Sequence, residues 1–257
     1  MTPVAAPAPA SAAAPAGLRA DRLDALRGLA LVWMAGFHFC FDLKVQGFLR
    51  ADFYTDPLWT RQRVAIVSLF LLCAGVGQAL ALHQGQTWAR FWRRWVQIVG
   101  CALLVTLASR VMFPSSFITF GVLHAMALLL IATRCLGQAR CPPPVLLLIG
   151  LAVVGAPWAV ADPFFDTRWT QWIGFVTRRP LTEDFVPVFP WWGVMLIGLA
   201  AGQWTLQHRP GWLLGPRLTY ALGRALAGLG RWSLSFYMLH QVVLVGLVTA
   251  AAWWLRR

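Results

Sequence analysis

The amino-acid sequence predicts an all-α protein, a polytopic bundle of about seven transmembrane helices. Of its 257 residues, 59% are hydrophobic and only 12% are charged, whereas about 25% of the residues of a soluble domain are charged. Apolar runs long enough to span a bilayer recur along the whole chain. Arginines form short clusters between these runs, a pattern typical of charge at the membrane surface.

The first 18 residues differ from the rest, because they are almost all alanine and proline. Such a segment has no core to bury, so we expect a disordered tail at 1–18 and one integral-membrane domain at 19–257. Arg19, Arg22 and Arg27 precede the first apolar run, which predicts a cytoplasmic N-terminus. The net charge of +13 indicates anionic lipid headgroups or an anionic substrate as partners, and not nucleic acid.

The expected spans follow from the apolar runs and from the turn residues between them. They are residues 24–47, 59–82, 95–112, 118–134, 145–160, 191–206 and 232–254. The long polar connection 162–190 is expected outside. Between the last two spans, Arg217, Arg224 and Arg231 recur at seven-residue steps, which predicts one charged face of an interfacial amphipathic helix.

The first span carries an unusual stripe. Residues spaced three and four apart share one face of a helix, and this face contains Asp24, Gly28, Leu31, Ala35, His38 and Asp42. A stripe with polar ends and a small middle is typical of a surface that packs on other helices or lines a wet cavity.

His38 and Asp42 are the candidate catalytic pair on this stripe. A carboxylate one turn from an imidazole can accept its N–H, fix its tautomer and raise its basicity. Counted from Gly28 at about 1.5 Å per residue, His38 lies roughly 15 Å deep, near the middle of the bilayer. Ionisable groups at this depth indicate function, although a purely structural hydrogen bond between helices remains the alternative.

Two further histidines are expected at similar depths. His240 shares a helix face with Ser233 and Tyr237, and its expected depth in the bilayer is close to that of His38. His124 lies near the outer end of its span, and its expected depth is close to that of Asp42. We therefore expect His124, His240 and Tyr237 to support the site, while each histidine alone could equally be a satisfied packing residue.

Arginines near the predicted inner surface form a second candidate group. Arg90 and Arg94 lie on one helical face, and Arg27 and Arg231 lie at the ends of other spans. Guanidinium groups bind phosphate in bidentate fashion, so a ring of these four suits a phosphate or nucleotide diphosphate. Anchoring to anionic lipid is the alternative for each of them.

The other candidate features are weaker. Tryptophans and carboxylates of the outer connection, with Asp184 and Trp191 at its end, could hold a sugar, although an aromatic belt at the interface has the same composition. The five cysteines form neither a CxxC nor a Cys/His pattern, so we expect no disulfide and no metal.

Five segments in order resemble a known family: RLDALRGLALVWMAGFHFCFDL, VSLFLLCAGVG, FGVLHAMALLL, EDFVPVFPWWGVMLIG and GRWSLSFYMLHQ. Ten residues separate Arg27 from His38, as in the R-x10-H motif, and Arg90/Arg94 is similar to the R-x-x-x-R motif. The chain resembles the heparan-α-glucosaminide N-acetyltransferase catalytic-domain family, in particular its small bacterial members, within the superfamily of transmembrane acyltransferases.

The resemblance implies a membrane-embedded acyltransferase of the bacterial inner membrane. Its acyl donor would be cytoplasmic acetyl-CoA, held by Arg27, Arg90, Arg94 and Arg231. Its acceptor would be a hydroxyl or amine of an extracytoplasmic sugar or glycan, near Asp184 and Trp191. His38 and Asp42 would catalyse the transfer. Because the wider superfamily has more spans, a homodimer that closes the site is a further expectation.

Two other classes of function remain open from the sequence. Intramembrane histidine and aspartate layers could relay protons in a transporter, but no internal inverted repeat is evident. The polar stripe could also join helices in a non-catalytic membrane scaffold.

Overall fold

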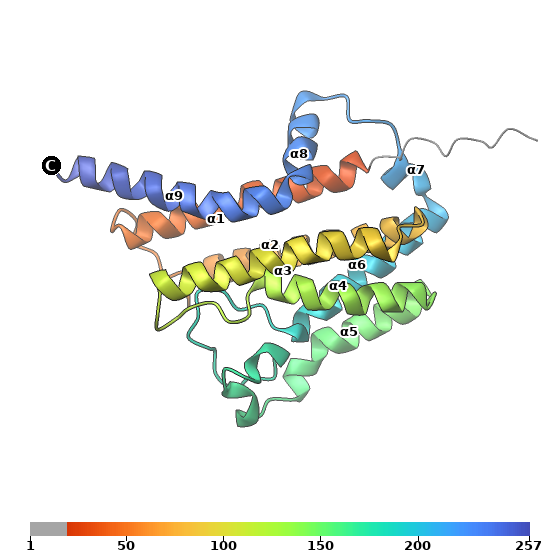
Figure 1. Cartoon of the computed structure of the whole chain (residues 1–257), viewed down its shortest axis with the longest axis horizontal. Coiled ribbons are helices and arrows are strands. Elements are labelled where there is room, and N and C mark those ends of the chain that lie inside the picture. The colour runs from red at the N-terminus through yellow and green to blue at the C-terminus, as the bar shows by residue number, and fades with distance from the viewer. Residues whose placement is uncertain (1–19) are drawn as a thin grey trace, which may run out of the picture.

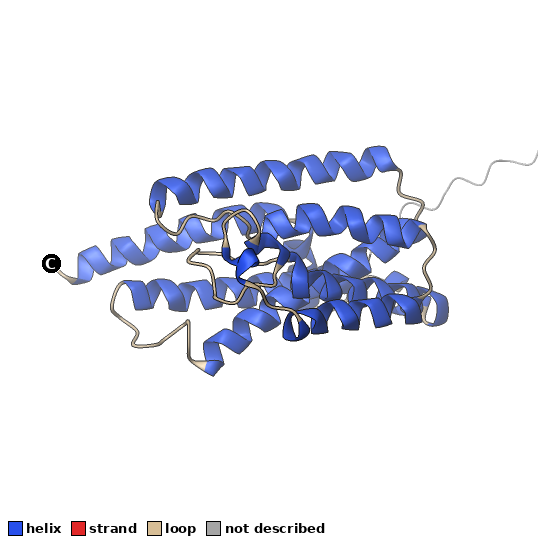
Figure 2. Cartoon of the chain, turned by 90° about the horizontal axis from the view of Figure 1, so that it is seen from below, coloured by secondary structure: helices blue, strands red, loops and turns tan. Residues whose placement is uncertain are grey.

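The computed structural model describes residues 20–257, and the predicted tail at 1–18 lies outside them. Within this part of the chain only helices, turns and loops occur (Figures 1 and 2), which confirms the all-α expectation. The elements are α1 (Asp21–Val45), α2 (Pro57–His83), α3 (Trp88–Met112), α4 (Val122–Gln138), α5 (Pro143–Ala159), η1 (Pro163–Asp166), η2 (Gln171–Ile173), α6 (Val188–His208), α7 (Pro210–Leu214), α8 (Ala221–Arg231) and α9 (Ser233–Leu255).

All seven predicted spans correspond to helices, namely α1 to α6 and α9. In the described chain, α1, α2, α3 and α9 are long and apolar enough to cross a membrane, whereas α4 and α5 are shorter apolar helices. The protein is therefore a membrane protein, and its full count of spans stays a prediction.

Capping residues explain where two helices begin. The Asp56 side chain accepts a hydrogen bond from Leu58 N, and Pro57 occupies the first turn of α2. Thr87 caps α3 by accepting from Arg90 N. The sequence placed the start of α3 at residue 95, and this was wrong because the Thr87 cap extends the helix toward α2.

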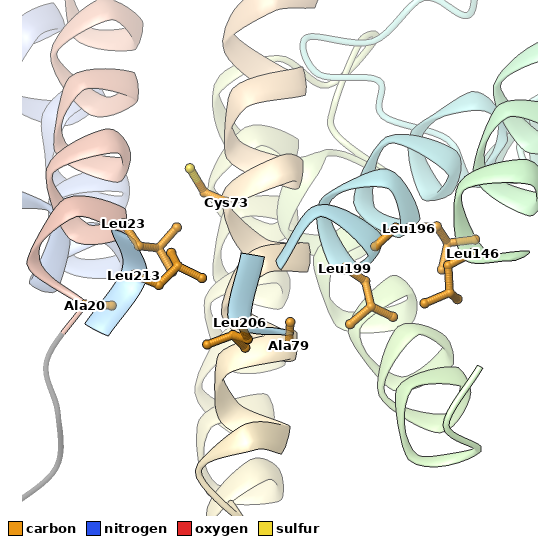
Figure 3. Packing of buried hydrophobic residues seen from close by; sticks show 10 residues of the cluster. Ala20, Leu23, Cys73, Ala79, Leu146, Leu196, Leu199, Leu206 and Leu213 are labelled. Atoms are coloured by element: carbon orange, nitrogen blue, oxygen red, sulfur yellow. The ribbon is translucent and has the colours of Figure 1, made fainter. Parts of the chain in front are cut away.

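The helices α2 and α6 pack closely at the centre of the bundle. A Cβ at Gly75 would overlap the carbonyl oxygen of Met195, and a Cβ at Gly198 would overlap that of Leu72. Small residues allow such backbone contact in membrane bundles. Buried leucines of one cluster continue from this crossing: Figure 3 shows Leu146 of α5 beside Leu196 of α6, and Leu23 of α1 beside Leu213 of α7.

A second close crossing holds the short helix α8 against α1 (Figure 1). Gly28 packs on the backbone of Leu226, and Gly230 packs on the backbone of Asp24. The expected charged face is only partly right, because Arg217 lies before α8 while Arg224 and Arg231 lie within it. Pro216 precedes Arg217 and has no N–H to donate, which favours irregular backbone there.

The connection from α5 to α6 folds back over the start of α4. Asp166 accepts a hydrogen bond from Thr177 N at 2.7 Å, and hydrogen bonds from Thr177 lower the pKa of the Asp166 carboxyl. Gln171 Nε2 donates to Thr119 Oγ1 at 3.1 Å. Side chains of this connection therefore reach the segment just before α4.

Candidate active site

The polar stripe of α1 faces α8 and α9, as expected for a surface that contacts other helices. Its lower part is Gly28 and Leu31, both fully covered. Toward the C-terminal end of α1 the stripe contains His38, whose ring lies beside that of His240, and Asp42, which accepts a hydrogen bond from Gln241. The stripe therefore places an imidazole and a carboxylate inside the protein and not toward lipid.

His38 lies beside His240, as their depths predicted. The two ring centroids are 5.2 Å apart and the ring planes are inclined at 56°. His240 is only 8% exposed, and its ring stacks on Phe236 with centroids 5.8 Å apart. Residues separated by about 200 positions in the chain thus form one histidine pair between α1 and α9.

The protonation pattern of His240 follows from its backbone contact. Its Nδ1 lies 2.7 Å from the carbonyl oxygen of Tyr237. A carbonyl only accepts, so Nδ1 carries the proton and Nε2 presents a lone pair. Among the described residues nothing donates to this buried Nε2, which leaves an unused basic nitrogen next to His38.

Asp42 does not orient His38 in the way that the sequence suggested. Its Oδ1 accepts a hydrogen bond from Gln241 Nε2 at 3.1 Å, and within residues 20–257 no hydrogen bond joins the carboxylate to His38. Asp42 is 6% exposed. Its Oδ2 and the Oε1 of Gln241 are buried without partners among the described residues, so two further acceptors lie near the histidine pair.

His124 makes its hydrogen bonds away from Asp42, and the second polar layer expected from depth stays a prediction. The backbone N–H of Gly121 donates to Nδ1 of His124 at 3.3 Å. Its Nε2 must then carry the proton, and it donates to Thr106 Oγ1 at 3.0 Å, which itself donates to the Ile118 carbonyl at 2.8 Å. His124 therefore has both nitrogens satisfied and joins α3 to the first turn of α4.

Tyr237 and Asp184 connect the histidine pair to the outer connection. Tyr237 packs against the buried cluster of Leu31, Met34 and Ile66, within electrostatic range of Asp184. Asp184 accepts a hydrogen bond from Val122 N at 2.7 Å, so it caps α4. Burial raises the pKa of the Asp184 carboxyl, while the Val122 N–H and the charge of Arg63 oppose this.

Trp191 lies in the first turns of α6 and packs on the buried cluster that contains Leu71, Leu129 and Met195. Asp184 and Trp191 thus both make structural contacts, and their role in holding the acceptor stays a prediction.

Two predicted arginines line a groove of about 960 Å³ between α3 and α9. Arg94 and Arg231 contribute its polar end, and Leu104, Met238 and Leu239 contribute apolar wall. Arg90 lies one turn before Arg94, is exposed, and is not part of this lining. All three arginines are exposed, but only Arg94 and Arg231 line the groove.

Arg27 belongs to the same end of the bundle. It forms an ion pair with Asp24 at 2.9 Å, and Gly77 leaves room for its guanidinium against α2. Its charge acts on Arg94, and Asp24 also lies within electrostatic range of Arg231. We call Arg27, Arg94 and Arg231 the arginine cluster.

The sequence missed two residues that the structure makes prominent. Gln241 directly follows His240, and its polar side chain in an apolar run was the available signal. Arg134 is 0% exposed, donates to Gln86, and lies over the rings of Trp88 and Phe91 at 5.1 Å. It connects the end of α4 to the start of α3.

The fold and the site define an integral membrane protein with a histidine pair between two helices and a basic groove. Comparison with known families then gives the particular family: residues 19–242 match the family model described as heparan-alpha-glucosaminide N-acetyltransferase, catalytic. The chain belongs to this family of membrane acetyltransferases. No curated protein and no solved structure matches it significantly.

Proposed function

We propose that this protein transfers an acetyl group from acetyl-CoA to a hydroxyl or amine of a sugar on the far side of a bacterial inner membrane. The observation that carries the proposal is the pair of half-buried His38 and buried His240, 5.2 Å apart by ring centroid. Membership of an acetyltransferase family supports it. In this proposal the N-terminus and the arginine cluster lie on the cytoplasmic side.

The groove between α3 and α9 suits the donor. Phosphates of acetyl-CoA would pair with Arg94 and Arg231 at its polar end, where guanidinium groups give charge-assisted hydrogen bonds. The apolar stretch of Leu104, Met238 and Leu239 would accompany the pantetheine arm. Arg27 adds positive charge behind this entrance.

His38 would act as the general base. It takes the proton from the acceptor hydroxyl or amine while that oxygen or nitrogen bonds to the thioester carbonyl carbon. The C–S bond then breaks, and the proton passes from His38 to the departing CoA thiolate. The helices around His38 limit access of water, which would otherwise hydrolyse the thioester.

Asp42 lies one helical turn from His38, and one of its carboxylate oxygens has no hydrogen-bond donor among the described residues. Its Oδ1 is held by Gln241, and Oδ2 has no donor among residues 20–257. We propose that Oδ2 accepts a hydrogen bond from the acceptor group. A second copy of the chain, if it associates, would close the groove on its lipid side.

Replacing Arg94 with alanine should raise the KM for acetyl-CoA about tenfold or more, with little change in kcat. One lost charge-assisted hydrogen bond costs about 1.5–3 kcal/mol, and 1.4 kcal/mol is tenfold in affinity. Arg90→Ala is the matched control, because it removes the same charge one turn away outside the groove. Equal effects of the two variants on KM would contradict donor binding in this groove.

The function itself is tested with purified protein in lipid nanodiscs. We would incubate it with acetyl-CoA, with and without amino sugars, and follow release of free CoA thiol and acetylated sugar. Sugar-dependent thiol release supports the acetyltransferase. No release, together with proton-coupled uptake into vesicles, would identify a transporter instead. Absence of both activities would favour a scaffold.

A further inference from the structure

The proposed function requires the ring of His38 to be held in one orientation, and it names no residue that does so. A neutral histidine is a base at its unprotonated nitrogen, and an acceptor for its other N–H fixes which nitrogen that is and how the ring is oriented. Within the described residues His38 makes no hydrogen bond, and Asp42, its expected partner, is engaged by Gln241. His38 therefore lacks the partner that the sequence assigned to it.

We propose that His240 is the positioning residue for His38, and that its Nε2 accepts the N–H of His38. This inference rests on the proposed function, in which His38 is the base. His240 offers an acceptor that is buried, has no other partner among residues 20–257, and lies on the ring next to His38. At a centroid separation of 5.2 Å, facing ring nitrogens reach hydrogen-bonding distance when the rings turn toward each other.

The acceptor nitrogen of His240 is held in place from two sides. The hydrogen bond from Nδ1 to the Tyr237 carbonyl, 2.7 Å long, fixes the tautomer that leaves Nε2 unprotonated. The ring of Phe236 stacks on His240 with an interplanar angle of 7°. The ring of His240 therefore has a fixed position and a fixed tautomer. Its Nε2 lone pair points in one direction, so a hydrogen bond to it would orient the ring of His38.

The proton balance of the reaction is consistent with this arrangement. His38 donates one N–H to His240 and keeps its other nitrogen free to take the acceptor's proton. The resulting imidazolium still hydrogen-bonds to neutral His240, whose own proton stays on Nδ1 and is donated in a hydrogen bond to the Tyr237 carbonyl. When the proton moves from His38 to the CoA thiolate, both histidines return to their starting states.

Two substitutions of His240 separate positioning from packing. His240→Asn keeps a donor near the position of Nδ1 for the Tyr237 carbonyl but removes the acceptor at Nε2. His240→Gln places an amide oxygen near the position of Nε2. We expect His240→Asn to lower kcat roughly 10- to 100-fold with little change in either KM, and His240→Gln to recover most of that loss.

A merely structural histidine would give the opposite order, because asparagine preserves the observed hydrogen bond to Tyr237 and glutamine does not. Equal kcat for His240→Asn and the unmodified protein would overturn the proposal. So would a loss of kcat in Asp42→Asn that His240→Asn does not share, since Asp42 would then be the orienting group. Full activity of His38→Ala would instead overturn the proposed function.

A measurement without turnover completes the test. ¹⁵N-histidine-labelled protein in lipid bilayers reports the tautomer of His38 by NMR, with its signals assigned by their loss in His38→Ala. We expect a single tautomer in the unmodified protein and in His240→Gln, and a mixture in His240→Asn. The same tautomer population in all three would overturn the proposal, even in protein that shows no acetyl transfer.

Discussion

Replacing His38 with alanine should lower kcat for acetyl transfer by roughly 10²- to 10⁴-fold, the contribution of a well-placed general base. The imidazole lies between α1 and α9, beside His240. The structure records no hydrogen bond to His38 within residues 20–257, so its removal costs no more than the proposed contact with His240. Expression and thermal unfolding should therefore change little.

The control for this variant is His208→Ala. His208 is an exposed histidine at the end of α6, stacked on Trp204, and its loss should leave kcat unchanged. The measurement is single-turnover acetyl transfer in nanodiscs, which separates chemistry from product release. An active His38→Ala variant would show that the base lies elsewhere.

Replacing Gly198 with leucine should prevent stable assembly of the bundle. A Cβ at this position overlaps the backbone carbonyl of Leu72, which cannot move aside as a flexible side chain can. The α2–α6 contact carries buried leucines of the largest cluster, including Leu196 and Leu199. Separating the two helices exposes these leucines and costs several kcal/mol, the scale of severe packing defects.

The matched control is Gly246→Leu on α9, since a Cβ at Gly246 meets nothing within 4 Å. Size-exclusion profiles and thermal unfolding in detergent should show aggregation or a strongly lowered Tm for Gly198→Leu and a normal profile for Gly246→Leu. Similar behaviour of the two variants would mean that the α2–α6 crossing is not what holds the bundle together.

Apolar periodicity predicted the helices well because lipid contact leaves a strong pattern in composition. Depth along a helix was also predictable, since each residue adds a fixed rise. This is why the pairing of His38 with His240 could be expected before the structure. The stripe on α1 was recognisable for the same reason, because its spacing alone places Gly28 and His38 on one face.

The rotation of each helix about its axis was not predictable from the sequence. Asp42 and His124 have similar depths, but α4 turns His124 toward Thr106 on α3, and Gln241 takes the Asp42 carboxylate. Arg90 and Arg94 share a helical face in the sequence, yet only Arg94 reaches the groove. Packing between helices determines these rotations, and they cannot be predicted from a single sequence.

The shortness of α5 has a consequence for the surrounding bilayer. Its 17 residues extend only about 26 Å, less than the roughly 30 Å hydrocarbon thickness of a typical membrane. Leu147, Leu148 and Leu151 are exposed on this helix and would face acyl chains in the predicted seven-span arrangement. In that arrangement lipid next to α5 thins to match it, so bilayers of shorter acyl chains should accommodate the protein with less deformation.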